Sequence, residues 1–95
     1  MYGTTMIGKL ADGVSAEQIK AELKAWETER DVPGYLSSHV MVTEDGRTIV
    51  NVAVFENKET YMALADDPAQ DEWYQKHYAP LLDGDPQWID GAWLT

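Results

Sequence analysis

The stretch from residue 48 to residue 55, Thr-Ile-Val-Asn-Val-Ala-Val-Phe, limits the possible folds of this chain more than any other segment. Alternate residues of a β-strand point to opposite faces. One face of this strand would carry Val50, Val52 and Val54. The other face is apolar apart from one asparagine and would carry Ile49, Asn51, Ala53 and Phe55. A strand of this kind has to be covered on both sides. A chain of 95 residues has helices enough for one side, so the sequence predicts a partner, most simply a second copy of itself.

Composition excludes several classes of function. The chain has 17 acidic residues against 7 lysines and arginines, a formal net charge of −10. We therefore expect no nucleic-acid partner and no anionic membrane surface, because both would repel it. The absence of cysteine excludes disulfides and thiolate chemistry. No apolar run approaches about 18 residues, and the first residues do not form a signal peptide. We expect a cytoplasmic protein.

The remaining pattern indicates one domain, residues 1–95, built from short strands and helices. Strands are predicted at 2–10, 35–43, 48–55 and 87–94. Helices are predicted at 16–30, 58–66 and 69–79. Their starts are marked by a Ser15–Gln18 capping box, by Asn57, and by Asp67 followed by proline. The order β-α-β-β-α-β predicts an α+β, ferredoxin-like antiparallel sheet with both helical segments on one face. The other face would pack against a second copy and form a dimeric barrel.

A hairpin fixes the register of the two central strands. Asp45 and Gly46 are predicted to be the centre of a two-residue turn, which places positions summing to 91 opposite each other. The predicted pairs include Val40 with Asn51, Ser38 with Ala53, Leu36 with Phe55 and His39 with Val52. In this register Ser38, Asn51 and Phe55 share one face of the sheet. His39 lies on the opposite face, where an interface role is the simpler interpretation.

The element order carries a resemblance, together with Pro33-Gly34-Tyr35 before the second strand and the run from Val52 to Tyr61 into a helix. In these features the chain resembles the antibiotic biosynthesis monooxygenase-like family of the dimeric α+β barrel group. The resemblance implies a homodimer with a pocket in each subunit between sheet and helices. The family includes cofactor-free oxygenases of polycyclic phenols and haem-degrading oxygenases.

Three departures argue against haem degradation. Phe55 stands where that branch has tryptophan, the histidine position falls nearest Tyr74, and the first strand has no asparagine. Haem ligation by His77, one turn after Tyr74, stays open. No spacing of histidines and carboxylates indicates a metal site. We expect no metal and no cofactor.

Several residues are candidates for the pocket, each with a plainer interpretation. Asn51, if buried, needs a partner, which is either another side chain or a ligand. The aromatic residues of the helices form either a ligand wall or ordinary core: Trp26, Tyr61, Trp73, Tyr74 and Tyr78. Adjacent residues differ by about 100° around a helix, so not all of these should face inward. His77 is either a pocket base or a surface residue near a helix C-terminus.

The resemblance implies a monooxygenase-like protein that acts on a small aromatic or quinol substrate without a cofactor. A pocket base would remove a phenolic proton, and the resulting carbanion would reduce oxygen. His77 or Tyr74 would carry the proton, and Asn51 would orient the substrate oxygen. Trp26, Ser38, Phe55 and Tyr61 would bind the substrate. The alternative is a non-catalytic homodimer that binds a small hydrophobic molecule or serves as a scaffold.

Overall fold

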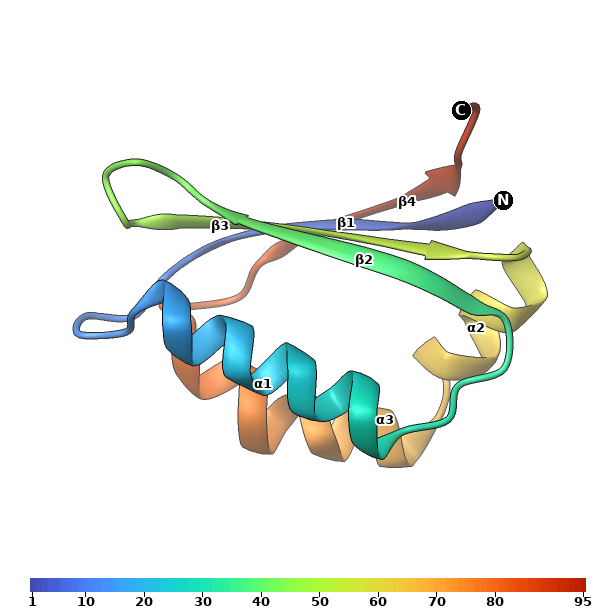
Figure 1. Ribbon diagram of the computed structural model, residues 1–95, viewed down its shortest axis with the longest axis horizontal. Coiled ribbons are helices and arrows are strands. Elements are labelled where there is room, and N and C mark those ends of the chain that lie inside the picture. The colour runs from blue at the N-terminus through green and yellow to red at the C-terminus, as the bar shows by residue number, and fades with distance from the viewer.

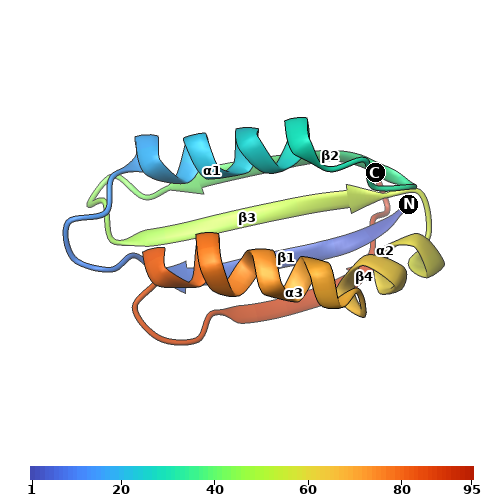
Figure 2. The same cartoon turned by 90° about the horizontal axis from the view of Figure 1, so that it is seen from below.

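The computed structural model describes residues 1–95 as one antiparallel sheet with every helix on the same face (Figures 1 and 2). The strands are β1 (Tyr2–Lys9), β2 (Tyr35–Val42), β3 (Thr48–Phe55) and β4 (Gln87–Ala92). They lie in the order β2-β3-β1-β4. The predicted α+β, ferredoxin-like arrangement is confirmed. The first, second and fourth strands end one or two residues earlier than predicted.

Local capping explains where the first two helices begin. The helix α1 (Ala16–Glu29) starts after Ser15, whose side chain and that of Gln18 form both bonds of the predicted capping box. The helix α2 (Lys58–Ala65) starts after Asn57, whose side chain accepts from the backbone N–H of Thr60 at 2.9 Å. Both predicted starts are therefore confirmed.

The third helical segment is less regular than predicted. It comprises α3 (Pro68–Trp73), a π-helical turn (Tyr74–Tyr78) and a 3₁₀ turn (Ala79–Leu81), where one helix over 69–79 was expected. The backbone N–H of Ala79 donates to the carbonyl of Tyr74, five residues earlier, which is the bond that defines a π turn. A π turn has more residues per revolution than an α-helix, so it shifts the side chains that follow around the helix axis.

The β2–β3 hairpin has the predicted register over most of its length but a different turn. Val40 lies opposite Asn51 and His39 opposite Val52, as expected. The predicted two-residue turn would need positive φ at its first residue, and no residue other than glycine has positive φ. Instead the Gly46 N–H donates to the Thr43 carbonyl at 2.8 Å, which places Glu44 and Asp45 at the centre of the turn.

One predicted strand pair is wrong. Leu36 was expected opposite Phe55, but an irregularity between Tyr35 and Ser37 places Tyr35 there instead. Gly34, just before it, has a φ of +79°, and a Cβ at this position would overlap the side chain of Thr60 in α2. The shift brings the Tyr35 ring within 5.7 Å of the Phe55 ring, measured between centroids. Tyr35 thereby enters the layer between sheet and helices.

The apolar core fills one end of that layer. Its buried members are Met6, Leu10, Ile19, Ile49, Tyr78 and Leu82. The helix-free face of the sheet is uncovered, as Figure 1 shows. On that face the Met41 side chain is 57% exposed and that of Ile89 is 50% exposed, and the three valines of β3 are partly exposed. No helix is long and apolar enough to cross a membrane.

Candidate functional site

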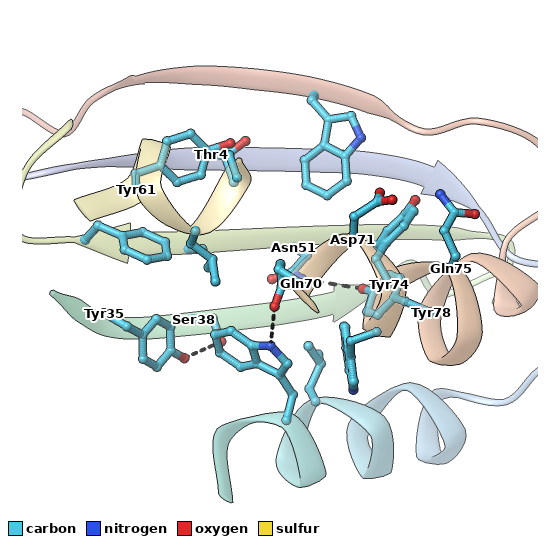
Figure 3. Close-up of a pocket in the computed structure, with 18 residues that line it drawn as sticks. Thr4, Tyr35, Ser38, Asn51, Tyr61, Gln70, Asp71, Tyr74, Gln75 and Tyr78 are labelled. Atoms are coloured by element: carbon cyan, nitrogen blue, oxygen red, sulfur yellow. Dashed lines mark hydrogen bonds between the residues drawn. The ribbon is translucent and has the colours of Figure 1, made fainter. Parts of the chain in front are cut away.

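The other end of the layer between sheet and helices is hollow. A cavity of about 320 Å³ lies there, lined by 18 residues (Figure 3). This volume is at the lower end of the range for small-molecule sites, roughly 300–1,000 Å³. Twelve of the lining residues are hydrophobic. The cavity therefore suits a small, largely apolar ligand.

The sheet supplies the floor of the cavity from alternating positions of three strands. Ser38 of β2 and Thr4 of β1 both lie opposite Ala53 of β3. Asn51 and Phe55 lie two residues to either side of Ala53, on the same face. All five side chains line the cavity. The structure thus places the candidates Ser38, Asn51 and Phe55 together beneath the helices.

Aromatic rings form most of the wall. The five aromatic candidates all line the cavity: Trp26, Tyr61, Trp73, Tyr74 and Tyr78. The expectation that they could not all face inward is wrong. Trp73 ends α3 and Tyr74 begins the π turn, and this turn keeps Tyr74 and Tyr78 stacked at 5.8 Å with Trp73 still 6.1 Å from Tyr78.

Two further aromatic residues line the cavity and were not candidates. Tyr35 packs edge-on against Trp26 at 5.1 Å, and its position follows from the irregularity in β2. Trp88 lies opposite Met6 in the sheet and 5.9 Å from the ring of Tyr74. The alternation of residues along β4 could have identified Trp88, because Asp90 and Trp88 share the face that the helices cover. No feature of the sequence indicated the shift in register at Tyr35.

Asn51 is the polar group at the centre of the floor. Its Nδ2 donates to the hydroxyl of Tyr78 at 3.4 Å. Its Oδ1 is buried and has no hydrogen-bond partner in the protein. Buried polar atoms are nearly always paired, and an unpaired one costs about 1–3 kcal/mol. The amide is therefore satisfied on its nitrogen side only, and its oxygen lacks a hydrogen-bond donor.

Several other polar side chains around the cavity are already engaged. The Tyr35 hydroxyl lies 2.8 Å from that of Ser38 and donates to Glu27 at 3.1 Å. The Trp26 Nε1 donates to Gln70 Oε1 at 2.8 Å (Figure 3). The Tyr61 hydroxyl donates to Asp90 at 2.9 Å. These bonds fix the rings of the wall and leave the amide oxygen of the floor without a donor.

The tyrosines of the cavity are acids that keep their protons. Burial raises the pKa of Tyr78 to about 12 and that of Tyr61 to about 12. Burial also raises the pKa of Tyr74, with a smaller contribution from the negative charge of Asp85. At neutral pH these phenols are hydrogen-bond donors, so Tyr74 suits the role of proton donor better than that of base.

The histidines lie elsewhere. The His77 ring stacks on Trp73 at 5.9 Å, its side chain is half exposed, and its Nδ1 is 3.5 Å from Glu22 Oε2. It does not line the cavity, whose only carboxylate lining residue is Asp71. His39 is exposed on the strand position opposite Val52, on the helix-free face. No group of three or more histidines and carboxylates is placed to hold a metal ion.

Comparison with known proteins identifies the fold. No family profile and no curated protein matches the chain. Solved antibiotic biosynthesis monooxygenase-like proteins share its structure, which confirms the resemblance inferred from the sequence. One is the ActVA-Orf6 monooxygenase of Streptomyces coelicolor in complex with nanaomycin D (23% identity, TM-score 0.70, covering 99% of this chain and 91% of that one).

Two other solved structures show that the fold carries different reactions. SnoaB of Streptomyces nogalater, a cofactor-independent oxygenase, is 14% identical with a TM-score of 0.74, covering 99% of this chain and 94% of that one. A hydroxynitrile lyase of Passiflora edulis is 10% identical with a TM-score of 0.68, covering 95% and 90%. Identities this low show the fold alone, so the function has to be argued from the cavity.

Proposed function

We propose that this protein is a cofactor-independent oxygenase-like enzyme that acts on a small phenol or quinol in the cavity. The observation that supports it most is the buried, unpartnered Oδ1 of Asn51 on the floor of an aromatic cavity. Aromatic walls suit a planar ring, and the amide oxygen suits its hydroxyl. Trp26, Phe55 and Tyr61 would hold the ring, with Ser38 on the floor beside them.

The chemistry of such a substrate needs no bound cofactor. The substrate hydroxyl donates to Asn51 Oδ1. Its proton leaves together with the first electron that the ring transfers to dioxygen, so no charged phenolate has to be held in the cavity. A ring C–H becomes C=O, one oxygen atom is retained in the product, and the other leaves as water. The substrate supplies all four electrons that dioxygen takes up. Within the cavity the Asp71 carboxylate can accept a proton, and Tyr74 can donate one to the reduced oxygen.

Oxygen uptake with a panel of dihydroxynaphthalenes tests this function. Asn51→Ala should lower kcat/KM roughly 10-fold, because it removes one hydrogen bond to the reacting hydroxyl. His77→Ala should leave the rate unchanged, because the imidazole lies outside the cavity. The absence of uptake with every substrate, or equal rates in wild type and Asn51→Ala, would contradict the proposal. A lower rate of oxygen uptake in His77→Ala would instead indicate that His77 carries the substrate proton.

One observation favours the alternative, a non-catalytic protein that binds a small hydrophobic molecule. No histidine, lysine or arginine lines the cavity, the phenols there hold their protons, and Asp71 is the one carboxylate among the lining residues. A binding protein needs no base, whereas an oxygenase needs a route for the substrate proton. Binding of dihydroxynaphthalenes without oxygen uptake would favour this function.

We also propose that the protein works in the cytoplasm as a homodimer, with the helix-free sheet face covered by a second copy. The partly exposed valines of β3 and the exposed Met41 and Ile89 lie on this face. Val52→Asp should shift the protein to a monomer in sedimentation. Met62→Asp introduces the same negative charge at an exposed residue of α2 and should leave the protein a dimer. A wild-type protein that sediments as a monomer at micromolar concentration would contradict the dimer.

A further inference from the structure

We propose that the cavity selects aromatic ligands that are neutral or positively charged and carry hydrogen-bond donors, and that it excludes ligands with a carboxylate or phosphate group. This inference rests on the cavity being the ligand site of the proposed function. It narrows the substrate class from any small aromatic molecule to hydroxy- and amino-substituted rings without an acidic group.

The cavity has no cation to receive an acidic ligand. None of the seven lysines and arginines of the chain is among the lining residues. Arg30, at the end of α1, is held by Asp67 at 3.1 Å, and Lys76 is held by Glu72 at 2.8 Å. A carboxylate that entered the cavity would lose water and gain no counter-charge, which is a strongly unfavourable transfer.

Carboxylates instead stand on three sides of the cavity. Asp71 of α3 is a lining residue. Glu27 of α1 accepts hydrogen bonds from Tyr35 at 3.1 Å and from Ser38 at 3.2 Å. Asp90 of β4 accepts from Tyr61 at 2.9 Å. Three separate elements therefore place negative charge next to lining side chains, and their field repels an anion and attracts a cation.

The hydrogen bonds of three lining hydroxyls point to the same ligand chemistry. Tyr35, Ser38 and Tyr61 give their hydroxyl protons to carboxylates at the rim or to one another, so these protons do not face a ligand acceptor. The buried atom that lacks a partner, Asn51 Oδ1, is an acceptor. Its complement is an O–H or N–H group. The aromatic faces also attract cations through their quadrupoles.

Three naphthols that carry hydrogen, a carboxylate or an aminomethyl group at position 6 test the selection: 2-naphthol, 6-hydroxy-2-naphthoate and 6-(aminomethyl)-2-naphthol. The aminomethyl compound controls for the size of the substituent. Calorimetric titration without oxygen measures binding apart from turnover. The naphthoate should bind at least about 10-fold more weakly than 2-naphthol, because the carboxylates around the cavity oppose it even after partial screening by salt. The aminomethyl compound should bind at least as tightly as 2-naphthol. Equal affinity for the neutral and the anionic probe would overturn the inference.

Charge-neutralising variants separate a local effect from the net charge of the chain. Asp71→Asn and Glu27→Gln should each reduce the ratio of the two dissociation constants, naphthoate to 2-naphthol, by several-fold. This ratio is the affinity gap. Glu44→Gln removes the same charge from the hairpin turn, at the opposite end of the sheet from the cavity, and should leave the gap unchanged. A gap that Glu44→Gln narrows as much as Asp71→Asn would overturn the inference. Failure of all three probes to bind would overturn the proposed function as well.

Discussion

Replacing Asn51 with leucine should stabilise the ligand-free protein and remove the hydrogen bond that Asn51 Oδ1 would accept from a ligand hydroxyl. Asn51 is the only residue whose buried side chain leaves a polar atom without a partner, and that atom is Oδ1. Leucine has the same branched shape as asparagine and carries no polar atom, and its larger methyl groups can extend into the adjoining cavity. The substitution therefore exchanges a group that is unsatisfied without ligand for one that needs no partner.

The expected gain follows from two opposing terms. Removing the unsatisfied Oδ1 recovers about 1–3 kcal/mol. Losing the hydrogen bond from Nδ2 to the Tyr78 hydroxyl costs about 0.5–1.5 kcal/mol, and its 3.4 Å length places it at the weak end of that range. The net stabilisation is about 1 kcal/mol. In a domain of this size that corresponds to an increase in Tm of roughly 4–8 °C.

Thermal and urea unfolding of the ligand-free protein measure this effect. Thr4→Val is the matched control, because Thr4 is a buried polar residue on the same face whose hydroxyl is satisfied by the Ile89 carbonyl at 3.2 Å. It should be neutral or destabilising by up to about 1 kcal/mol. If Asn51→Leu, like Thr4→Val, leaves the free energy of unfolding unchanged or lowers it, Oδ1 has a hydrogen-bond partner in solution. It would then not be available to a ligand.

Three further results are expected. Gly34→Ala should cost about 2 kcal/mol or more in unfolding free energy, because it combines a positive φ with a clash against α2, whereas Gly13→Ala has positive φ and open space and should cost about 1 kcal/mol. Equal losses in the two variants would contradict this account of the turn. Asp67→Ala should lose about 1–2 kcal/mol with the N-cap of α3 and its ion pair, and its neighbour Asp66→Ala should change stability by less than about 0.5 kcal/mol. The folded-state pKa of Tyr78, about 12 against 10.0, means that the unfolded chain releases this proton first as pH rises. Stability to urea should therefore fall between pH 10 and pH 12. Tyr78→Phe should lessen that fall, and an undiminished fall would assign it to other groups.

The sequence predicted the parts of this structure that depend on regular alternation. The β2–β3 register was correct although the turn type was wrong, because strand length and the two apolar faces of β3 determine pairing more strongly than the turn does. The floor residues Ser38, Asn51 and Phe55 followed from that register. Their grouping needed no knowledge of the helices.

The parts that the sequence did not predict are local departures from regular geometry. The irregularity after Gly34 moved Tyr35 into the cavity, and the segment from Pro68 to Leu81 divides into an α-helix, a π turn and a 3₁₀ turn where one regular helix was predicted. Both depend on contacts with other elements, which no local pattern encodes. The same turn decides where His77 lies, so its position could not be read from helical spacing.

Asn51 Oδ1 is the buried acceptor that lacks a hydrogen-bond donor in the ligand-free protein. The most direct test is a crystal structure of the protein grown without oxygen in the presence of a dihydroxynaphthalene. We expect the ring to lie between Phe55 and the aromatic wall, with one hydroxyl within about 3 Å of Asn51 Oδ1. A ring bound on the helix-free face of the sheet, or a cavity that stays filled by its own side chains with Oδ1 newly paired, would contradict it.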